Sequence, residues 1–516
     1  METHNEPRAS YRSYVLLAVA WLAVLLLLTW FELRRLAPHE DLGFLLAPSN
    51  QEADRMLRHL TRTTIQLISL FTTVTAIAVP LTANLYTPRL IDMFVRDRIN
   101  RGFFTLLIFS SVTVHYTLYV MRERADFAFN PLLLINLAAG LGFLCMFLAG
   151  PYLYYMFNFL RPPGIVRRMQ RAVMWRLAAE RRGSSRRRRA IIADVVEQLG
   201  EVALRAGGRN DVAMAANVIE DLGEVASRYR GLKSQLPPEW FEGDPSPELS
   251  MTAAALNQLG RECCWFEFHL LRTIDGFLPA LVNNTPEAVA YVGRVTRQIV
   301  SDAHAAGDQS VVRMGLKFFN TYLRRTLLAR PPRALLFASD ELRQLGNALL
   351  DSTEPWTLSI ADSLAYYAAE AETGGALAAR DLLLYDLGEL VVTAMLVDSA
   401  RATLYRDVLY RAYEETNGRL EPLIKAIAQT IGQDRAELVQ PLARLLDRRD
   451  AAEVRRAVET VLGAVSGEYR EMTGRVVDLN HVEADRREAL RVWWESRLAD
   501  SMSERLAPSA PAPAIP

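Results

Sequence analysis

Cysteine and lysine are scarce in this sequence. Only three cysteines occur among 516 residues, at Cys145, Cys263 and Cys264, and two of them are adjacent. Three cysteines cannot build a disulfide framework, and adjacent cysteines rarely pair with each other. We therefore expect a reducing compartment. Three lysines stand against 56 arginines, which we attribute to a GC-rich coding bias.

The sequence also lacks the common signatures of catalysis. It contains no phosphate-binding Gly-x-x-x-x-Gly-Lys loop, no dinucleotide Gly-x-Gly-x-x-Gly loop, no His-Glu-x-x-His metal helix and no Gly-x-Ser-x-Gly elbow. The best metal candidate is Cys263, Cys264 and His269. A helix does not align Cys264 with His269 five residues later, and no second Cys/His group follows, so we interpret the cysteines as buried structural residues. We predict a protein that is not an enzyme and uses no cofactor.

An excess of one charge is missing overall but present regionally. The whole chain has 59 basic and 59 acidic residues. The 29 residues from 161 to 189 hold 11 arginines and one acid. The residues from 190 onward hold 35 basic and 47 acidic side chains. A phosphate backbone is held by a surplus of Lys and Arg. The acidic C-terminal region therefore argues against nucleic acid as a partner.

Four long apolar stretches without Asp, Glu, Lys or Arg occupy the first third of the chain. About 20 apolar residues are needed to cross a bilayer, and backbone groups in lipid must find partners within their own segment, which favours helices. The stretches predict a transmembrane domain over residues 1–160 that contains a four-helix bundle. Its spans are expected at about 13–31, 63–87, 102–121 and 131–151.

Arginines cluster beside these spans and predict the topology. Basic loops stay on the cytosolic side, so we expect a multi-pass protein of the bacterial inner membrane with both termini in the cytosol. Residues 161–189 form an Arg-rich juxtamembrane segment that faces anionic headgroups, either as a topology signal or as a regulated lipid sensor. The membrane-surface arginines that we predict are Arg89, Arg96, Arg98, Arg167, Arg168, Arg186, Arg187, Arg188 and Arg189.

The second span is unusually polar, so we expect it to lie centrally in the bundle. One interpretation is that its polar side chains join helices, aided by close packing at Ala138 and Gly142 of the fourth span. The other is a polar pathway through the bundle. Only one ionisable side chain lies inside the spans, which disfavours active transport. The pathway residues would be Thr72, Thr75, Asn84, His115 and Asn136.

The hairpin between the second and third spans carries a family resemblance. It reads Tyr86-Thr87-Pro88-Arg89-Leu90, followed by Phe94-Val95-Arg96-Asp97-Arg98. This resembles the Ser-Pro-Arg-Leu and Phe-x-x-Asp-Arg-like signature of a widespread bacterial family known as predicted membrane proteins of unknown function. The segment Ala203-Leu204-Arg205-Ala206 with Asn210-Asp211 is similar to a second motif of that family. The resemblance covers about residues 62–224; it implies four membrane helices with a cytosolic tail and no assigned activity. From the residues themselves, we expect Asp92 and Asp97 to pair with the neighbouring arginines.

Residues 190–506 show helical apolar spacing and no convincing alternating strand pattern. Asp450 with Glu453 has the form of a helix start. Trp240 in a proline-rich break is expected to fill a gap beside the core, with a docking role as the alternative. The predicted fold class is all-α, with helical hairpins stacked as a solenoid or, alternatively, packed as an irregular bundle. Residues 507–516 are rich in Pro and Ala and are expected to be disordered.

These features together favour a non-catalytic membrane scaffold or sensor. Its partners would be the bilayer, further copies of itself as a homo-oligomer, and an unknown cytosolic protein bound by the helical domain. The alternative is a homo-oligomeric ion channel or pore that the cytosolic domain gates.

Overall fold

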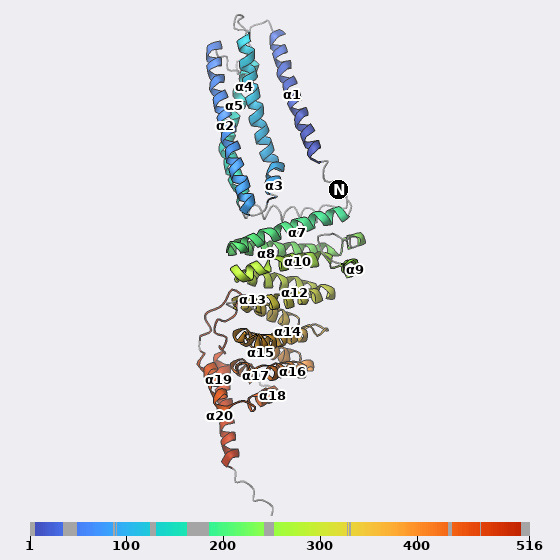
Figure 1. The fold of residues 1–516 in the computed structure, drawn as a ribbon, viewed down its shortest axis with the longest axis vertical. Coiled ribbons are helices and arrows are strands. Elements are labelled where there is room, and N and C mark those ends of the chain that lie inside the picture. The colour runs from blue at the N-terminus through green and yellow to red at the C-terminus, as the bar shows by residue number, and fades with distance from the viewer. Residues whose placement is uncertain are drawn as a thin grey trace, which may run out of the picture. The chain divides into compact units, whose positions relative to one another are not determined.

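The computed structural model of the chain describes residues 6–34, 49–85, 88, 90–123, 131–161, 185–241, 252–327, 329, 332–431, 436–464 and 466–506, without the side chains of 6–16, 18, 185–188, 253, 436–437 and 500–506. It divides into two compact units, Met1–Ile165 and Val166–Pro516, which are described separately (Figure 1). Over these ranges the elements are helices, and the only strand-like pairing is an isolated bridge between Arg470 and Val476. The all-α prediction is confirmed. The tail at 507–516 lies outside the described residues.

The first unit consists of α1 (Glu6–Arg34), α2 (Asn50–Leu85), α3 (Leu90–Arg96), α4 (Arg98–Glu123) and α5 (Leu132–Leu160). Among the described residues, α2, α4 and α5 are long and apolar enough to cross a membrane. The first expected span, 13–31, lies within α1, most of whose side chains before Leu17 are outside the description, so its role as a span stays a prediction.

The end expected for the fourth span at residue 151 is not the end of α5, which continues through Pro151 to Leu160. Proline removes one helical hydrogen bond, but membrane helices tolerate this when packing compensates. Tyr152, Met156 and Phe159 are buried on one face beyond Pro151. Their packing therefore carries the helix past the proline.

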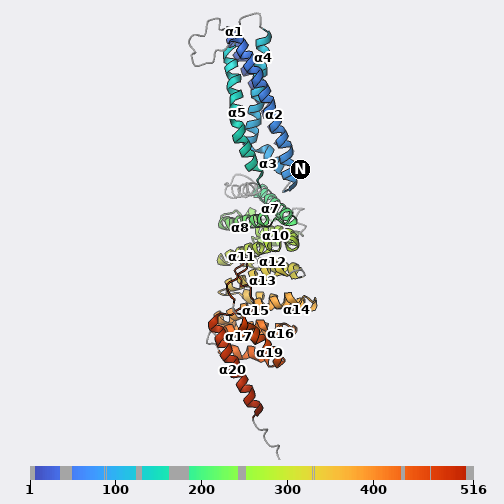
Figure 2. The ribbon, with the colours of Figure 1, turned by 90° about the vertical axis from the view of Figure 1, so that its left-hand side faces the viewer.

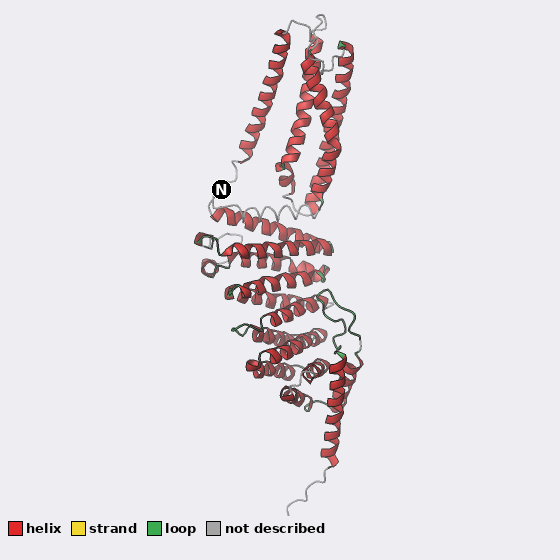
Figure 3. Ribbon diagram, turned by 180° about the vertical axis from the view of Figure 1, so that it is seen from behind, coloured by secondary structure: helices red, strands yellow, loops and turns green. Residues whose placement is uncertain are grey.

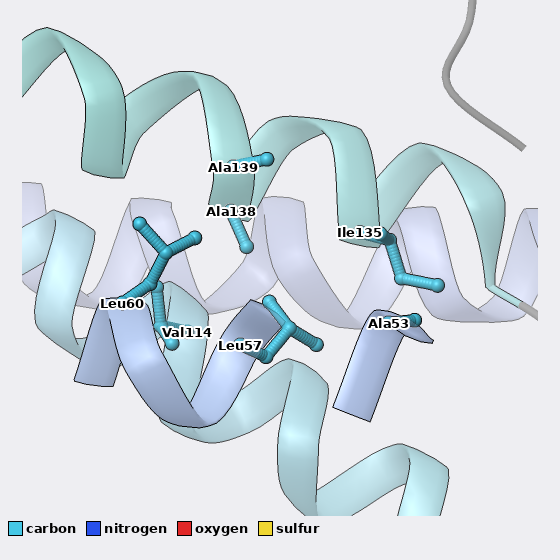
Figure 4. Packing of buried hydrophobic residues seen from close by; sticks show 7 residues of the cluster. All are labelled: Ala53, Leu57, Leu60, Val114, Ile135, Ala138 and Ala139. Carbon is cyan, nitrogen blue, oxygen red and sulfur yellow. The ribbon is translucent and has the colours of Figure 1, made fainter. Parts of the chain in front are cut away.

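Close contact of α2 with α5 forms one core cluster of the first unit (Figure 4). A Cβ added to Gly142 would lie 2.8 Å from Leu60 Cδ2, so a larger residue there would push α2 away. The expected close packing at Ala138 and Gly142 is confirmed. The buried residues of this cluster are Ala53, Leu57, Leu60, Val114, Ile135, Ala138 and Ala139.

Helix α1 packs on α4 and α5. The Trp21 ring stacks on Phe109 at 5.2 Å between centroids, and its Nε1 donates to Thr113 Oγ1 at 3.1 Å. At the other end of α1, Glu32 is 5% exposed and accepts a hydrogen bond from the backbone N–H of Leu133. The first N–H groups of a helix lack partners within it, so this carboxyl group caps α5.

Asp97 has a different role from the one expected. Its Oδ1 accepts from the backbone N–H groups of Ile99 and Asn100 at 3.0 and 3.1 Å, and from the Tyr155 hydroxyl at 2.9 Å. These bonds cap the start of α4 and tie it to α5. A capping role therefore accounts for this acid, in place of the ion pair with an arginine that we expected.

The second unit is a stack of helical hairpins arranged in two rows (Figures 1 and 2). Each helix contacts the next one in its own row, and short turns join most helices to the other row. This arrangement favours the solenoid over the irregular bundle. The first row is α7 (Ser185–Gly208), α10 (Trp265–Asn284), α12 (Gln309–Leu327), α14 (Trp356–Thr373), α16 (Ala402–Glu415) and α18 (Ala436–Leu446). The second row is α8 (Val212–Lys233), α11 (Ala288–Ala305), α13 (Arg333–Ala348), α15 (Leu377–Val397), α17 (Glu421–Ile431) and α19 (Ala451–Gly463).

Shorter elements complete the second unit. The 3-10 turn η1 (Pro238–Trp240) and α9 (Ala253–Arg261) lie between α8 and α10 in the sequence, η3 (Ser399–Arg401) precedes α16, and α20 (Ala484–Leu506) packs on α17 and α19. The helix start at Asp450 is confirmed, since its side chain accepts from Glu453 N at 3.2 Å. Trp240 is 1% exposed and donates to the Tyr229 hydroxyl at 3.1 Å, so it fills a gap in the core as expected.

The stack depends on a glycine where α12 crosses α11. A Cβ added to Gly315 would lie 2.0 Å from Val300 Cγ2, and a valine in a helix has essentially one side-chain rotamer with which to respond. We expect Gly315→Ala to lower the free energy of unfolding by about 1–3 kcal/mol through overpacking. Urea unfolding of the detergent-solubilised chain, followed by circular dichroism, measures it.

Two further variants control this prediction. Val300→Ala in the Gly315→Ala chain should restore most of the lost stability, because it removes the clashing methyl groups. Gly276 in α10 has nothing within 4 Å of an added Cβ, so Gly276→Ala should be neutral or stabilising. Equal destabilisation by both glycine replacements would contradict the packing explanation.

Candidate functional site

A series of ion pairs links successive helices of the second row, and we call it the charge ladder. Arg297 of α11 pairs with Glu341 of α13 at 2.6 Å. Arg343 of α13 lies 3.3 Å from carboxylate oxygens of both Asp386 and Glu389 on α15. Lys425 of α17 completes the ladder with Glu389 at 2.6 Å. Each pair joins neighbouring helices of the row, so the ladder runs along the stack.

Most of the charge ladder is buried. Asp386 and its neighbour Asp340 are fully buried, and Lys425 is 7% exposed. Asp340 binds Arg343 at 2.6 Å. Buried charges are tolerated only when they are paired and hydrogen-bonded, so this cluster depends on its full set of cations.

The cations of the ladder, together with Arg475 from the segment between α19 and α20, control the ionisation of its acids. Burial raises the pKa of Glu389, but Lys425, Arg343 and Arg475 together outweigh that effect and hold the pKa at about 2. Burial also raises the pKa of Asp386, against the opposing effect of Arg475 and Arg343. The cluster can therefore hold a cation tightly, and it takes up protons if a cation is withdrawn.

Residues 466–483, between α19 and α20, form an irregular segment that we call the strap. Its tip is a short hairpin, in which Val477 N donates to Tyr469 O at 2.9 Å and Glu471 N donates to Arg475 O at 2.7 Å. Gly474 makes the turn with φ of +87°, in the left-handed region that favours glycine. Figures 1 and 3 show this loop running beside the stack from α19 back toward α13.

The strap contacts four helices of the second row in succession, largely through its backbone. Side chains of α11, α13 and α17 donate to strap carbonyl oxygens, and the acid of α15 binds a strap arginine. These contacts are Arg294 to Met472 O at 3.3 Å, Gln344 to Thr473 O at 3.3 Å, Asp386 to Arg475 Nη1 at 3.1 Å, and Lys425 to Leu479 O at 2.8 Å. The Tyr385 hydroxyl of α15 also donates a hydrogen bond to Asn480 Oδ1 of the strap. Backbone contacts do not depend on the side chains of the bound segment, so this face can hold a polypeptide segment that lacks regular secondary structure.

The residues of the expected polar pathway are not brought together within one chain. Thr72, Asn84 and His115 are exposed, and the ring Nδ1 of His115 lies 2.7 Å from Ser111 O of its own helix. Thr75 is half-buried with its hydroxyl 3.9 Å from Met156 Sδ, and Asn136 donates to Leu132 O at 2.8 Å.

Other polar side chains occupy the core of the first unit. Thr64 donates to Leu60 O at 2.6 Å, and Thr117 donates to Thr113 O at 2.8 Å, each within its own helix. Ser110, Thr113 and Asn100 are buried as well. Locally bonded hydroxyls of this kind cost little in an apolar core. Their arrangement is one that supports helix packing.

The structure describes only part of the expected membrane-surface arginines. Arg96 at the end of α3 and Arg98 at the start of α4 are both exposed. Arg189 is 8% exposed, and its guanidinium lies 5.8 Å from the centre of the Trp265 ring, so it packs within the helical stack. The expected positions Arg89, Arg167 and Arg168, and the side chains of Arg186, Arg187 and Arg188, lie outside the described residues.

The cysteine and histidine candidates contact the protein backbone. Cys264 is buried, and its Sγ lies 3.8 Å from Leu259 O. His269 Nε2 lies 3.3 Å from Ala193 O, and its ring stacks on Trp265 at 5.8 Å. No group of three or more potential ligands is found in the part of the chain that the structure describes. The arrangement is that of packed structural residues.

The fold and the sites described above define an all-α membrane protein in which an apolar helical bundle precedes a two-row helical stack. Residues 8–195 match the family described as "Predicted membrane protein (DUF2254)", which confirms the resemblance found in the hairpin. The match spans α1 to the first part of α7; the second motif at 203–211 and the rest of the stack lie beyond it. No curated protein and no solved structure matches the chain.

Proposed function

We propose that this protein is a bacterial inner-membrane scaffold that binds a partner protein on the second row of its helical stack and performs no catalysis. One observation carries the proposal: the row holds an irregular segment, the strap, mainly by donating hydrogen bonds to its carbonyl oxygens. Stacked helical repeats present long continuous surfaces of this kind to other proteins. The Arg-rich residues 161–189 support a cytosolic position for the stack.

The spacing of the row suits an extended chain. Neighbouring packed helices lie about 8–10 Å apart, and an extended residue advances about 3.3 Å, so a fully extended segment meets a new helix roughly every two to three residues. The strap contacts the four successive helices at Met472, Thr473, Arg475 and Leu479, so its contacts are one, two and four residues apart.

Site-specific photo-crosslinking in intact cells tests the scaffold. A photoreactive amino acid replaces Arg294, which lies on α11 at the strap tip, in the full-length chain. The matched control replaces Glu220, an exposed residue of α8 away from the strap. We expect a discrete crosslinked protein from position 294 and none from 220. Equal labelling at both positions, or no product from either, would argue against partner binding on this face.

Self-association is the second part of the proposal, and it is supported by α2. In its most apolar 18-residue stretch only 17% of the residues are buried, against 33% in α4 and 39% in α5. Gln66, Ser69 and Thr73 are exposed and spaced three and four residues apart, which places them on one helix face. Polar side chains in a membrane usually face other helices, so a second copy is the partner we propose for this face.

The rival proposal is a homo-oligomeric channel gated by the stack. It is favoured by the same exposed polar face of α2, since several copies could arrange Thr73 and Asn84 around a pore. Ion flux through reconstituted protein that changes on Asn84→Leu would favour the channel. A silent bilayer under varied salt and voltage would favour the scaffold.

A further inference from the structure

Two residues of the strap are buried: Arg475 near its tip, and Val482 at its end next to α20. The Arg475 side chain is 5% exposed and its Nη1 lies 3.1 Å from both carboxylate oxygens of Asp386. Three large apolar residues of the strap are exposed, Tyr469 at 71%, Val477 at 52% and Met472 at 41%, while Val476 and Leu479 are half-buried. The tip of the strap is therefore anchored on the stack by one arginine and a few backbone contacts, while Asn480 and Val482 hold the end of the strap next to α20.

A segment held in this way opens more easily than the helices beneath it. Regions with few buried apolar contacts open at low free energy, while packed helices open only with the whole domain. By contrast, α15 beneath the strap is buried along most of its length. The strap can thus leave its place while the stack stays folded.

The charge count of the cluster specifies what must replace the strap. Three acids, Asp340, Asp386 and Glu389, face two cations of the stack, Arg343 and Lys425. Arg475 supplies the third cation. Without it the cluster has to bury an unpaired carboxylate or take up a proton, and either change costs stability. An incoming segment is therefore favoured if it brings a positive charge to Asp386.

Arginine fits this position better than lysine. Its planar guanidinium can address both oxygens of a carboxylate and is less strongly hydrated than an ammonium group, so it loses less on burial. Buried arginines are also frequent anchors of protein interfaces. The carbonyl oxygen four residues after the arginine would meet Lys425, as Leu479 O does in the strap.

We propose that Asp386, with Asp340 and Glu389, forms an arginine-anchor site for an extended segment of a partner protein, and that the strap is its resident, displaceable occupant. This inference rests on the proposed scaffold function and names the chemistry of its ligand. The strap and the partner compete for one site, so a partner binds only if its binding free energy exceeds the cost of displacing the strap. The partner segment is extended, carries an arginine, and needs no large apolar residue beside it.

A labelled synthetic peptide with the sequence of residues 466–483 tests the exchange. Fluorescence anisotropy measures its binding to the full-length protein in lipid nanodiscs and to the Arg475→Gln protein, in which the anchor site lacks its own arginine. We expect the peptide to bind the variant at least 10-fold more tightly than the wild type. A peptide carrying Arg475→Gln should bind the variant at least 10-fold more weakly than the native peptide does, and Arg475→Lys should lie between.

Several outcomes overturn the inference. The arginine-anchor site would be excluded if the folded Arg475→Gln protein failed to bind the native peptide. It would also be excluded if that protein bound the arginine and glutamine peptides equally. Hydrogen exchange of the wild-type protein gives an independent check if the variant does not fold. The strap amides from 469 to 477 should exchange at least 100-fold faster than those of α13 and α15, and equal protection would exclude a displaceable strap. Crosslinking from Arg294 can still succeed in either case, so failure here is distinct from failure of the scaffold.

Discussion

Replacing Arg343 by methionine is expected to lower the free energy of unfolding of the helical stack by about 3–5 kcal/mol, the usual cost of removing one partner from a buried ion pair. Arg343 binds Asp340 at 2.6 Å and lies 3.3 Å from both Asp386 and Glu389. Without it, these three acids, of which Asp340 and Asp386 are fully buried, face only Lys425 and Arg475. Methionine keeps the apolar part of the side chain, so the loss is one of charge.

Hydrogen exchange of the α13 and α15 amides measures this effect where it arises, since a chain with two units need not unfold in one step. The matched control is Arg448→Met, because Arg448 forms a 2.8 Å pair with Glu414 in which both side chains are at least half exposed. Exposed pairs contribute at most about 1 kcal/mol. Asp340→Asn added to Arg343→Met should recover part of the loss by restoring the charge balance. Similar losses for Arg343→Met and Arg448→Met would show that the cluster does not stabilise the stack.

Membrane helices could be predicted because their signal is local. Each span is a run of apolar residues that has to form its own backbone hydrogen bonds, so α2, α4 and α5 appear where the sequence places them. Helix α5 continues past Pro151, where we expected the fourth span to end, since the proline signal is local while the compensating packing of Tyr152 and Phe159 is not. Helical spacing likewise identified the hairpins of the stack, but not which rows they would form.

The charge ladder and the strap could not be predicted for the same reason. Arg343 and Asp386 lie on different helices, and their meeting depends on how α13 stacks on α15. The strap falls within a region that we predicted to be helical to residue 506. Gly467 and Gly474 are the local signals that could have marked it as irregular, and the rest of its conformation comes from contacts with α11 to α17.

The polar residues of α2 show that composition can identify an unusual helix but cannot predict which of its faces is covered. Their number correctly suggested that this helix differs from the others, and a central position was the natural expectation. Within one chain, however, α1 packs on α4 and α5 through Trp21 and Glu32, and the face with Ser69 and Thr73 stays exposed. Which face of α2 another helix covers depends on the side chains of that other helix as well as on those of α2.

Thiol labelling of the folded protein is expected to separate the adjacent cysteines by a large factor. Burial, with a smaller effect of Glu267 and Glu262, raises the pKa of the Cys264 thiol to about 12. Alkylating reagents attack the thiolate, and a free cysteine has a pKa near 8.5, so Cys264 should react more than about a thousandfold more slowly than a free thiol at pH 8. Cys263 is only half-buried and should react first.

Peptide mass spectrometry after a time course with iodoacetamide assigns the label to each position. In urea the two cysteines should react at similar rates, because the difference comes from burial in the fold and not from the neighbouring sequence. Rapid labelling of Cys264 in the folded chain would show that α9 and α10 do not enclose its thiol. A metal site needs thiolates as ligands. A buried Cys264 thiol that donates to Leu259 O stays protonated and should not bind zinc. Protection of both cysteines by added zinc would therefore contradict this prediction and indicate a metal site.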